Sequence, residues 1–523
     1  MQTFKSKLTV ALLALLFFVP TLSKAQMAPA DIDKLVERAL KTFDVPGMAV
    51  AVVKDDKVVF EKGYGVRSLA RGGKVDENTL FGIASNSKAF TTAAIGILCD
   101  EGKLHLDDKV TDYIPEFRLY DPWVTSEFTI RDLLTHRSGL GLGAGDLMDF
   151  PDSTDFTMAD VIHNLRYFKP VTSFRSAYAY DNQLYKVAGE VIARVSGMPW
   201  EEFIEKRIMQ PLGMTQSRAA FQRLSGNTNY VDAHAPVDGP IKTIERYKTV
   251  TGDAAGGIYS SVHELCKWAI MQMDNGKYGD GKQLFSEAIH AQMWTPQTII
   301  PVGAAPGYYS THFGAYGLGW FLNDIKGYKE VSHTGGIDGM VTKVDLIPEL
   351  KLAIIVLTNQ QSGAAFSSVT NQIKDTYLGL SGRDWVQFYA DQVKSRGGDA
   401  KKVTDAAWKQ VDVRMHDGQK IDYSQYAGTY HDDWLGDIML TEKDGRLFFQ
   451  AKRSPKLNGE ILPYKANTFV VKWTIRSMDA DAFVIFSLDQ DGKPDGFKMK
   501  PISPATDFSY DFQDLDMHRV KQM

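Results

Sequence analysis

A serine and a lysine stand three residues apart in the stretch FGIASNSKAFTTAAIGIL, residues 81–98. Apolar residues recur there at helical spacing after a polar start, which predicts an amphipathic helix. On one face of a helix, Ser85 and Lys88 can touch. A serine hydroxyl is a poor nucleophile unless a nearby base takes its proton, and Lys88 can be that base only if burial or neighbouring cations favour its neutral amine. The pair therefore indicates either an activated nucleophile or a solvated helix end.

Two further segments carry groups that suit acyl transfer. YDNQLYKVAGEVIARVSG begins with Tyr180, whose phenolic oxygen a cation can hold as phenolate, and Asn182, whose amide both donates and accepts. SHTGGIDGMVTKVDLIP places residues 333–336, HTGG, at the start of a predicted strand, where glycines allow close backbone approach and free amides can bind an oxyanion. Singly, these residues also fit a core aromatic, a helix cap and a β-bulge. Their order and their places at element boundaries favour the chemical interpretation.

These motifs resemble those of the penicillin-recognising serine hydrolases, which include class C β-lactamases, D-alanyl-D-alanine carboxypeptidases, D-aminopeptidases and related esterases. The family patterns Ser-x-x-Lys, Tyr-x-Asn and Lys/His-Thr-Gly match the stretches that begin at Ser85, Tyr180 and His333. TIRDLLTHRSGLG and GDAAGGIYSSVHELCKWAIMQMDNG look like two other family segments. The resemblance therefore covers roughly residues 30–380.

The resemblance implies a two-step acyl transfer. Ser85 would attack a carbonyl carbon while Lys88 and Tyr180 share the general-base task. The backbone amides of Ser85 and Gly336 would form the oxyanion hole, Asn182 would orient the acyl side chain, and water activated by Tyr180 would release the product. The substrate-binding residues implied in this way are Asn182, His333, Thr334 and Gly335. No cofactor is implied, and the eleven histidines show no spacing typical of a metal site.

The third motif bears on the substrate. Related enzymes that prefer a free carboxylate next to the scissile bond usually place a permanent cation where this chain has His333, which is largely neutral at pH 7. This counts against efficient β-lactamase action. We expect a small-molecule or short-peptide substrate and a peptidase or amidase, with peptides that contain D-residues included. The alternatives are a carboxylesterase of the same fold, a β-lactamase, and a non-catalytic binding or sensor protein.

Residues 1–25 have a basic start, an apolar run and small residues ahead of Gln26, which predicts a cleaved secretion signal. We expect an exported bacterial protein, periplasmic or secreted, without stable insertion in a membrane; an uncleaved anchor is the alternative. The formal net charge is −5, and it becomes more negative when cleavage of the signal removes three lysines. A negative chain gives no electrostatic reason to expect nucleic acid or anionic lipid as a partner. Cys99 and Cys266 lie in apolar helical patterns and are predicted as buried thiols.

The order of predicted elements indicates an α+β fold. A helix ahead of Pro46 is followed by two β-branched runs around the turn KDDK, which predict a hairpin, and then by the helix that carries Ser85. Helix caps of the types Thr-x-x-Asp and Ser-x-x-Glu begin at Thr129 and Ser261. Together with the resemblance, these signals predict a β-lactamase/transpeptidase-like domain over residues 26–380, with an antiparallel sheet flanked by helices and an all-helical region.

The pattern changes after this domain. Residues 381–422 are polar and irregular and are predicted as a linker that contains one helix. Over residues 423–523, short alternating runs separated by Asp-Gly turns predict a small antiparallel barrel or sandwich, and the resemblance favours a lipocalin-like β-barrel. One hypothesis is that this domain limits access to small substrates. The alternative is a module for stability or interaction.

Overall fold

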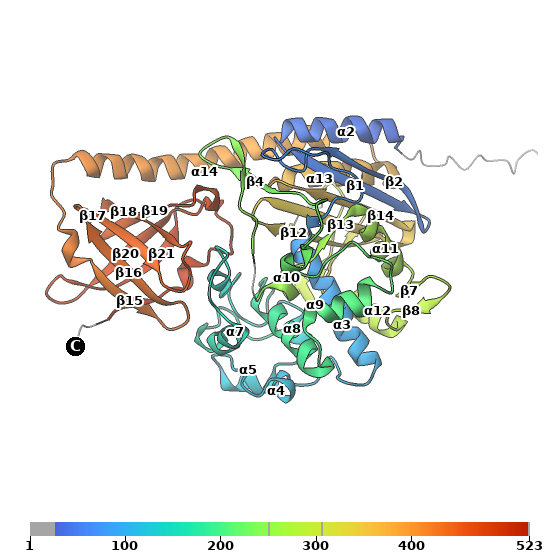
Figure 1. Cartoon of the computed structure of the whole chain (residues 1–523), viewed down its shortest axis with the longest axis horizontal. Helices are drawn as coiled ribbons and strands as arrows, with labels where there is room; N and C mark the ends of the chain where they lie inside the picture. Colours follow the sequence, from blue (N-terminus) through green and yellow to red (C-terminus); the bar gives the residue numbers. More distant parts are fainter. Residues whose placement is uncertain (1–26, 249–250, 305–306, 521–523) are drawn as a thin grey trace, which may run out of the picture.

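The computed structural model describes residues 27–248, 251–304 and 307–520, so the signal peptide predicted for residues 1–25 lies outside the described residues. Two units lie side by side and are joined by a long helix (Figure 1). Within the described ranges, no helix is both long and apolar enough to cross a membrane.

An eight-stranded antiparallel sheet forms the centre of the first unit, in the order β2-β1-β14-β13-β12-β11-β10-β9. β1 and β14 are buried along almost their whole length, as their continuous apolar runs require in the middle of a sheet. The predicted hairpin is confirmed, because β1 and β2 meet at Asp55 and Asp56, which both have positive φ as in a two-residue hairpin turn. The strands are β1 (Gly47–Lys54), β2 (Lys57–Gly65), β9 (Thr298–Ile300), β10 (Gly314–Tyr316), β11 (Phe321–Ile325), β12 (Tyr328–Ile337), β13 (Met340–Ile347) and β14 (Leu352–Thr358).

Helices cover both faces of this sheet (Figure 1). α2 (Pro29–Thr42) and α13 (Gly363–Leu378) pack on one face, in a core that they share with alternate residues of β1 and β14. α3 (Ser87–Asp100), α8 (Gln183–Ser196) and α11 (Val262–Met273) belong to a second core on the other face. The motifs that begin at Ser85 and Tyr180 lie on this second side, and the motif that begins at His333 lies on β12 of the sheet itself.

α3 differs from the expected amphipathic helix. Every residue from Ser87 to Leu98 is buried, because α3 runs through the middle of the second core. Several of its polar side chains find hydrogen-bond partners inside the protein; Thr91, for example, donates to the carbonyl oxygen of Ala254 at 2.6 Å. The prediction was wrong because short polar side chains on a helix look solvent-facing until their internal partners are known.

A helical region surrounds α3 and α8. The capping signals predicted there are confirmed: Thr129 and Asp132 form a reciprocal capping box, and Ser261 accepts from the amide of Glu264. The further helices are α4 (Val110–Tyr113), α5 (Pro122–Glu127), α6 (Ile130–Leu133), α7 (Met158–Asn164), α9 (Trp200–Ile204), α10 (Asp253–Gly256) and α12 (Glu287–Met293), and the short paired strands are β3 (Phe81–Gly82) with β6 (Tyr259–Ser260), β4 (Ala233–Pro236) with β5 (Ile241–Ile244), and β7 (Lys277–Tyr278) with β8 (Lys282–Gln283).

The second unit is a closed antiparallel barrel of eight strands, which confirms the predicted barrel and excludes the sandwich. Both predicted Asp-Gly turns connect neighbouring strands, at Asp444 and Asp491. Tyr430, Phe486 and Phe497 fill the interior, so the barrel is a packed core. The strands are β15 (Gly428–Asp432), β16 (Gly436–Lys443), β17 (Arg446–Ala451), β18 (Asn458–Lys465), β19 (Thr468–Trp473), β20 (Ala482–Leu488), β21 (Pro494–Pro501) and β22 (Met517–Arg519).

The helix between the units is α14 (Trp385–His416), which takes up most of the segment predicted as a linker. Its first turn packs on the first unit through Val386. Further along, Ala407 and Val411 pack against the barrel residues Val470 and Ile502. A helix anchored in both cores is a rigid connection rather than a flexible one.

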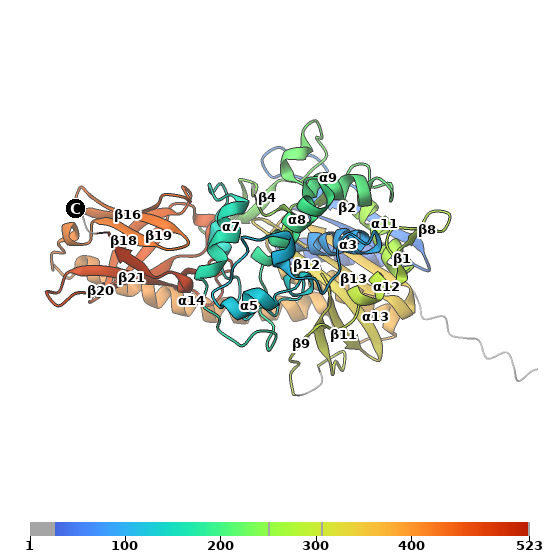
Figure 2. The same ribbon diagram turned by 90° about the horizontal axis from the view of Figure 1, so that it is seen from below.

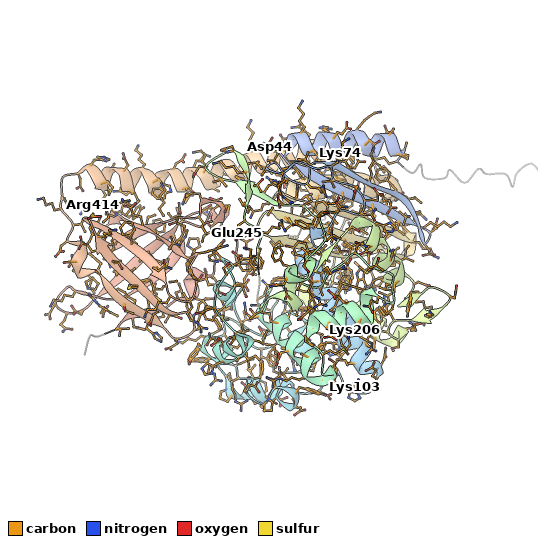
Figure 3. The ribbon with its side chains drawn as sticks, viewed as in Figure 1. Asp44, Lys74, Lys103, Lys206, Glu245 and Arg414 are labelled. Atoms are coloured by element: carbon orange, nitrogen blue, oxygen red, sulfur yellow. The ribbon has the colours of Figure 1, made fainter. Side chains whose placement is uncertain are left out.

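The barrel also contacts the helical region directly, beside α7 (Figure 2). Arg453 of the barrel pairs with Asp160 at 2.9 Å, and Lys456 pairs with Asp152 at 2.6 Å. Lys456 also reaches Glu245, which lies at the junction of the two units (Figure 3), at 3.0 Å. These ion pairs hold the barrel against the side of the first unit where the active-site motifs lie.

Candidate active site

Ser85 lies in a tight turn that leads into α3. The turn is the short 3₁₀ helix η2 (Ala84–Asn86), which is separated from β3 by one residue, Ile83. Ala84 has a φ of 47°, a left-handed conformation that a non-glycine residue adopts at a cost of about 1–3 kcal/mol. This strained turn places the partly exposed side chain of Ser85 at the wall of a cleft.

Lys88, one turn later, is fully buried beneath Ser85. Its Nζ atom lies 3.0 Å from Ser85 Oγ, 2.7 Å from Asn182 Oδ1 and 2.9 Å from the carbonyl oxygen of Ala255. Burial lowers the pKa of Lys88 to about 7, although the carboxyl groups of Asp146 and Asp181 oppose that shift. A lysine with such a pKa is a competent base near neutral pH.

The contacts of Lys88 leave one direction for its lone pair. The carbonyl of Ala255 can only accept. Asn182 presents Oδ1 to Lys88 because its Nδ2 atom donates to Asp146 at 2.8 Å. A neutral amine therefore spends both N–H groups on these two acceptors, and its lone pair points at the hydroxyl of Ser85. This is the arrangement that an activated serine requires.

Tyr180 lies beside this pair, with its ring centroid 4.8 Å from Lys88 Nζ. Burial raises the pKa of Tyr180 well above its ordinary value, although a hydrogen bond with Ser85 opposes the rise. The expectation of a phenolate held by a cation is therefore not met in the free site, because burial disfavours the charged form of the Tyr180 hydroxyl. The neutral phenol can pass a proton on, and Lys88 is the group whose pKa suits the resting base.

Asn182 begins α8 but makes no side-chain capping hydrogen bond, which excludes the helix-cap interpretation. Both ends of its amide are used within the site, by Lys88 and Asp146. Asp146 is fully buried, and burial raises its pKa to about 7 while the hydrogen bond from Asn182 opposes that rise. Asp146 was missed from the sequence, since nothing in GAGDLMDF marks it.

The third motif lies on β12, at the edge of the cleft. The pairing of β11 with β12 ends at Ser332, while the following residues continue to pair with β13 on their other side. At Gly335 a side chain would collide with the carbonyl of Ile83, so the strand can pass close to the Ser85 turn only with glycine there. Thr334 and Gly336 are exposed in the cleft. The structure therefore brings this motif and Ser85 to the same cleft.

His333 is buried and is not a cation at neutral pH. Burial lowers its pKa to about 3, and the nearby Lys88 contributes in the same direction. Its Nδ1 atom lies 2.6 Å from the carbonyl oxygen of Thr334, which can only accept, so Nε2 accepts from the hydroxyl of Tyr316 at 3.0 Å. His333 therefore supports the strand and offers no positive charge to a substrate.

The cleft over Ser85 has a volume of about 530 Å³ and a mainly apolar wall. The second unit contributes to it through Phe508, whose ring meets that of Tyr180 edge to face at 5.9 Å. In the described part of the chain, Lys186 is the one lysine or arginine that lines the cleft, and it is already paired with the buried carboxylate of Asp149. The other apolar or aromatic lining residues are Leu142, Phe150, Tyr178, Tyr247, Phe321, Ile337, Val341 and Phe366.

Metal binding finds no support in the described residues, which contain no group of three or more histidine, cysteine, aspartate or glutamate side chains arranged to hold an ion. The two cysteines are free thiols, Cys266 buried and Cys99 partly buried. Burial raises the pKa of the Cys266 thiol, so a cysteine nucleophile has no support either.

Comparison with known proteins agrees with this geometry. A family model described as Beta-lactamase matches residues 32–377, and one described as a domain of unknown function (DUF3471) matches residues 416–519. Unguisins hydrolase ungD of Aspergillus violaceofuscus is 29% identical over 445 residues, 80% of this chain and 77% of that protein. Protein flp of Staphylococcus aureus is 26% identical over 340 residues, 63% of each chain.

Solved structures show the same fold. The octameric penicillin-binding protein homologue from Pyrococcus abyssi has a TM-score of 0.61 at 21% identity and covers 94% of this chain and 100% of its own. A class C beta-lactamase has a TM-score of 0.53 at 21% identity over 67% of this chain and 96% of its own. Because the family model matches most of the sequence and the three motifs meet at one cleft, this chain belongs to the beta-lactamase family, which has a serine hydrolase fold.

Proposed function

We propose that this chain is an exported serine hydrolase that forms an acyl-enzyme on Ser85 and cleaves amide bonds in short peptides. One observation supports the reaction class. The buried amine of Lys88 lies 3.0 Å from Ser85 Oγ, while Asn182 Oδ1 and the carbonyl oxygen of Ala255 accept its two N–H groups. The wild-type protein should react with a fluorophosphonate, and intact mass spectrometry should detect a single adduct on Ser85. The same mass would report whether residues 1–25 have been removed. A protein that stays unlabelled would instead support a non-catalytic binding or sensor role.

In the first half of the reaction, Lys88 takes the proton of Ser85 as Oγ bonds to the substrate carbonyl carbon. The negative charge that develops on the carbonyl oxygen faces the amides of Ser85 and Gly336. The proton held by Lys88 then passes through the Tyr180 hydroxyl to the leaving nitrogen, the C–N bond breaks, and the acyl group remains on Ser85 as an ester. Asn182 orients the amine of Lys88 and contacts the acyl side chain of the substrate.

In the second half, a water molecule gives its proton to the Lys88 and Tyr180 pair and attacks the ester carbonyl. The C–Oγ bond breaks, Ser85 regains its proton, and the acid is released. A positioned base contributes about 10² to 10⁴-fold to such a rate, and one oxyanion-hole donor about 10² to 10³-fold. These are the contributions that the chain's own residues must supply.

The cleft favours substrates that are neutral and apolar around the scissile bond. His333 is neutral, Lys186 is paired, and the wall is aromatic and aliphatic. A free carboxylate beside the scissile bond would lose its hydration without gaining a cation as a partner. A peptide with a free C-terminus there should therefore have a kcat/KM roughly tenfold lower than that of the same peptide with a C-terminal amide. Parallel assays of the two peptides, in L- and D-forms, test this. Faster cleavage of the free acid would favour a carboxypeptidase, and rapid penicillin turnover a β-lactamase.

A carboxylesterase is the second candidate, favoured by the same lack of a free cation in the described lining. An ester needs little help to protonate its leaving group and less anchoring than a peptide. A p-nitrophenyl ester and a p-nitroanilide with the same apolar acyl group separate the two functions. Turnover of both supports the amidase; a protein that is labelled by the phosphonate but hydrolyses only the ester is an esterase.

Phe508 makes a further prediction about selectivity, because the barrel places it in the cleft wall beside Tyr180. Phe508→Ala should raise kcat/KM several-fold for substrates with bulky acyl groups, which is roughly the effect of one or two methylene groups in a substrate pocket. For small substrates, kcat/KM should stay nearly unchanged. Ile485→Ala, which removes an exposed apolar side chain of the barrel outside the cleft, is the matched control. Equal changes for large and small substrates would argue against a role of the barrel in access.

A further inference from the structure

The barrel reaches toward the catalytic residues through one buried carboxyl group. Asp511 lies between β21 and β22 and is fully buried. It begins the short helix η10 (Phe512–Asp514), but its side chain makes no capping hydrogen bond there. Instead, Oδ2 accepts from the amide of Gly145 at 2.8 Å and Oδ1 accepts from the amide of Leu147 at 2.9 Å. Both amides belong to the first unit.

These two amides flank Asp146 in a turn that lies between the barrel and the active site. Gly145 opens the turn with a φ of 85°, a left-handed conformation that favours glycine. Just ahead of the turn, the amide of Gly143 donates to the carbonyl oxygen of Tyr180 at 2.9 Å. The turn is therefore hydrogen-bonded both to Asp511 of the barrel and to the segment that carries Tyr180 and Asn182.

A continuous series of hydrogen bonds leads from this turn to the nucleophile. Asp146 Oδ2 accepts from Asn182 Nδ2 at 2.8 Å, Asn182 Oδ1 accepts from Lys88 at 2.7 Å, and Lys88 lies 3.0 Å from Ser85 Oγ. An asparagine amide can present either end, and only its partners decide which. Without Asp146 in place, the amide is free to turn and offer Lys88 a donor, which would displace the lone pair from Ser85.

We propose that Asp511 is a positioning residue for the Ser85 and Lys88 pair. By holding the turn that carries Asp146, it sets the orientation of the Asn182 amide and, through that amide, the direction of the Lys88 lone pair. The inference rests on the proposed function, since it assigns Asp511 to the support of that same reaction. The barrel is then part of the active-site framework and also a wall of the cleft.

The test is a double-mutant cycle in the full-length mature chain with Asp511→Ala, Asp146→Ala and the combination. Each single variant should lower kcat by about 10- to 100-fold, the loss that a displacement of about 1 Å in a catalytic group produces. The comparison uses kcat at saturating substrate, because Asn182, whose amide would turn in these variants, also contacts the acyl side chain and would change KM. Because Asp511 acts through Asp146, the double variant should be no slower than Asp146→Ala alone. Asp511→Asn keeps one acceptor and should be intermediate.

Two controls separate positioning from docking or unfolding. Arg453→Ala removes ion pairs with Asp155 and Asp160 across the same junction without touching the turn, and should keep kcat close to wild type. All kcat values are expressed per Ser85 that reacts with fluorophosphonate at the end point, so that an unfolded fraction cancels.

The outcomes distinguish this inference from the proposed function. Non-additive losses at Asp511 and Asp146, with Arg453→Ala active, support it. Any of three results would overturn the inference: a wild-type kcat in Asp511→Ala, additive losses in the double variant, or an equal loss in Arg453→Ala. The proposed function would still stand in these cases, provided that the wild-type protein is labelled at Ser85. A wild-type protein that never reacts at Ser85 overturns the proposed function and this inference with it.

Discussion

Ser85→Ala is expected to abolish turnover, by about 10⁴-fold or more, because the covalent route disappears and only binding and oxyanion contacts remain. The fold should persist, since Lys88 keeps its bonds to Asn182 and Ala255 when Oγ is removed. Hydrolysis assays and intact mass spectrometry after fluorophosphonate treatment would measure the two effects, with circular dichroism as the check on folding.

Ser87 is the matched control for that substitution. It lies two residues away, and its Oγ accepts from the amide of Ile258 at 3.1 Å, so its role is structural. Ser87→Ala leaves a buried amide unpaired and should reduce the free energy of unfolding by about 1–3 kcal/mol, while the remaining folded protein stays active and labelled. A well-folded Ser85→Ala variant that still turns over substrate would refute the acyl-enzyme mechanism.

Lys88→Met is the second large effect we expect, with kcat reduced about 10² to 10⁴-fold because the base is lost from a site of the same shape. In the wild type, kcat/KM should rise as pH increases through about 7, since the neutral amine is the active form and its pKa lies there. Lys88→Arg keeps a cation that cannot lose its proton. This variant should be as inactive as Lys88→Met, and its kcat/KM should not rise with pH near 7. An active Lys88→Arg variant would assign Lys88 an electrostatic role instead.

The same pKa shift makes a prediction about stability. Burial holds the pKa of Lys88 below its value in the unfolded chain. Between about pH 7 and the ordinary pKa of lysine, about 10.4, the unfolded state therefore binds more protons, so this residue makes stability increase as pH rises. Below pH 7 the charged amine is buried at a cost. Thermal melts should accordingly show that Lys88→Met is more stable than the wild type, with a smaller dependence on pH over this range.

Much of the local structure could be predicted because it depends on short-range rules. The hairpin at Asp55 and Asp56, the capping box at Thr129 and the Asp-Gly turn at Asp444 follow from backbone preferences of a few neighbouring residues. The alternating patterns of the second unit predicted an antiparallel barrel or sandwich, and the tertiary structure decided for the closed barrel. α3 was mistaken for an amphipathic helix because its polar residues find partners far away in the chain.

By itself, the sequence determined which groups could do chemistry: Ser85 with Lys88, Tyr180 with Asn182, and the glycines that follow His333. Only the tertiary structure decided their states, because a pKa depends on burial and on charges brought in from distant segments. Burial makes Lys88 a base, keeps Tyr180 protonated and holds His333 neutral. Likewise, the bonds from Asp511 join residues more than 360 positions apart, a contact that no local pattern encodes.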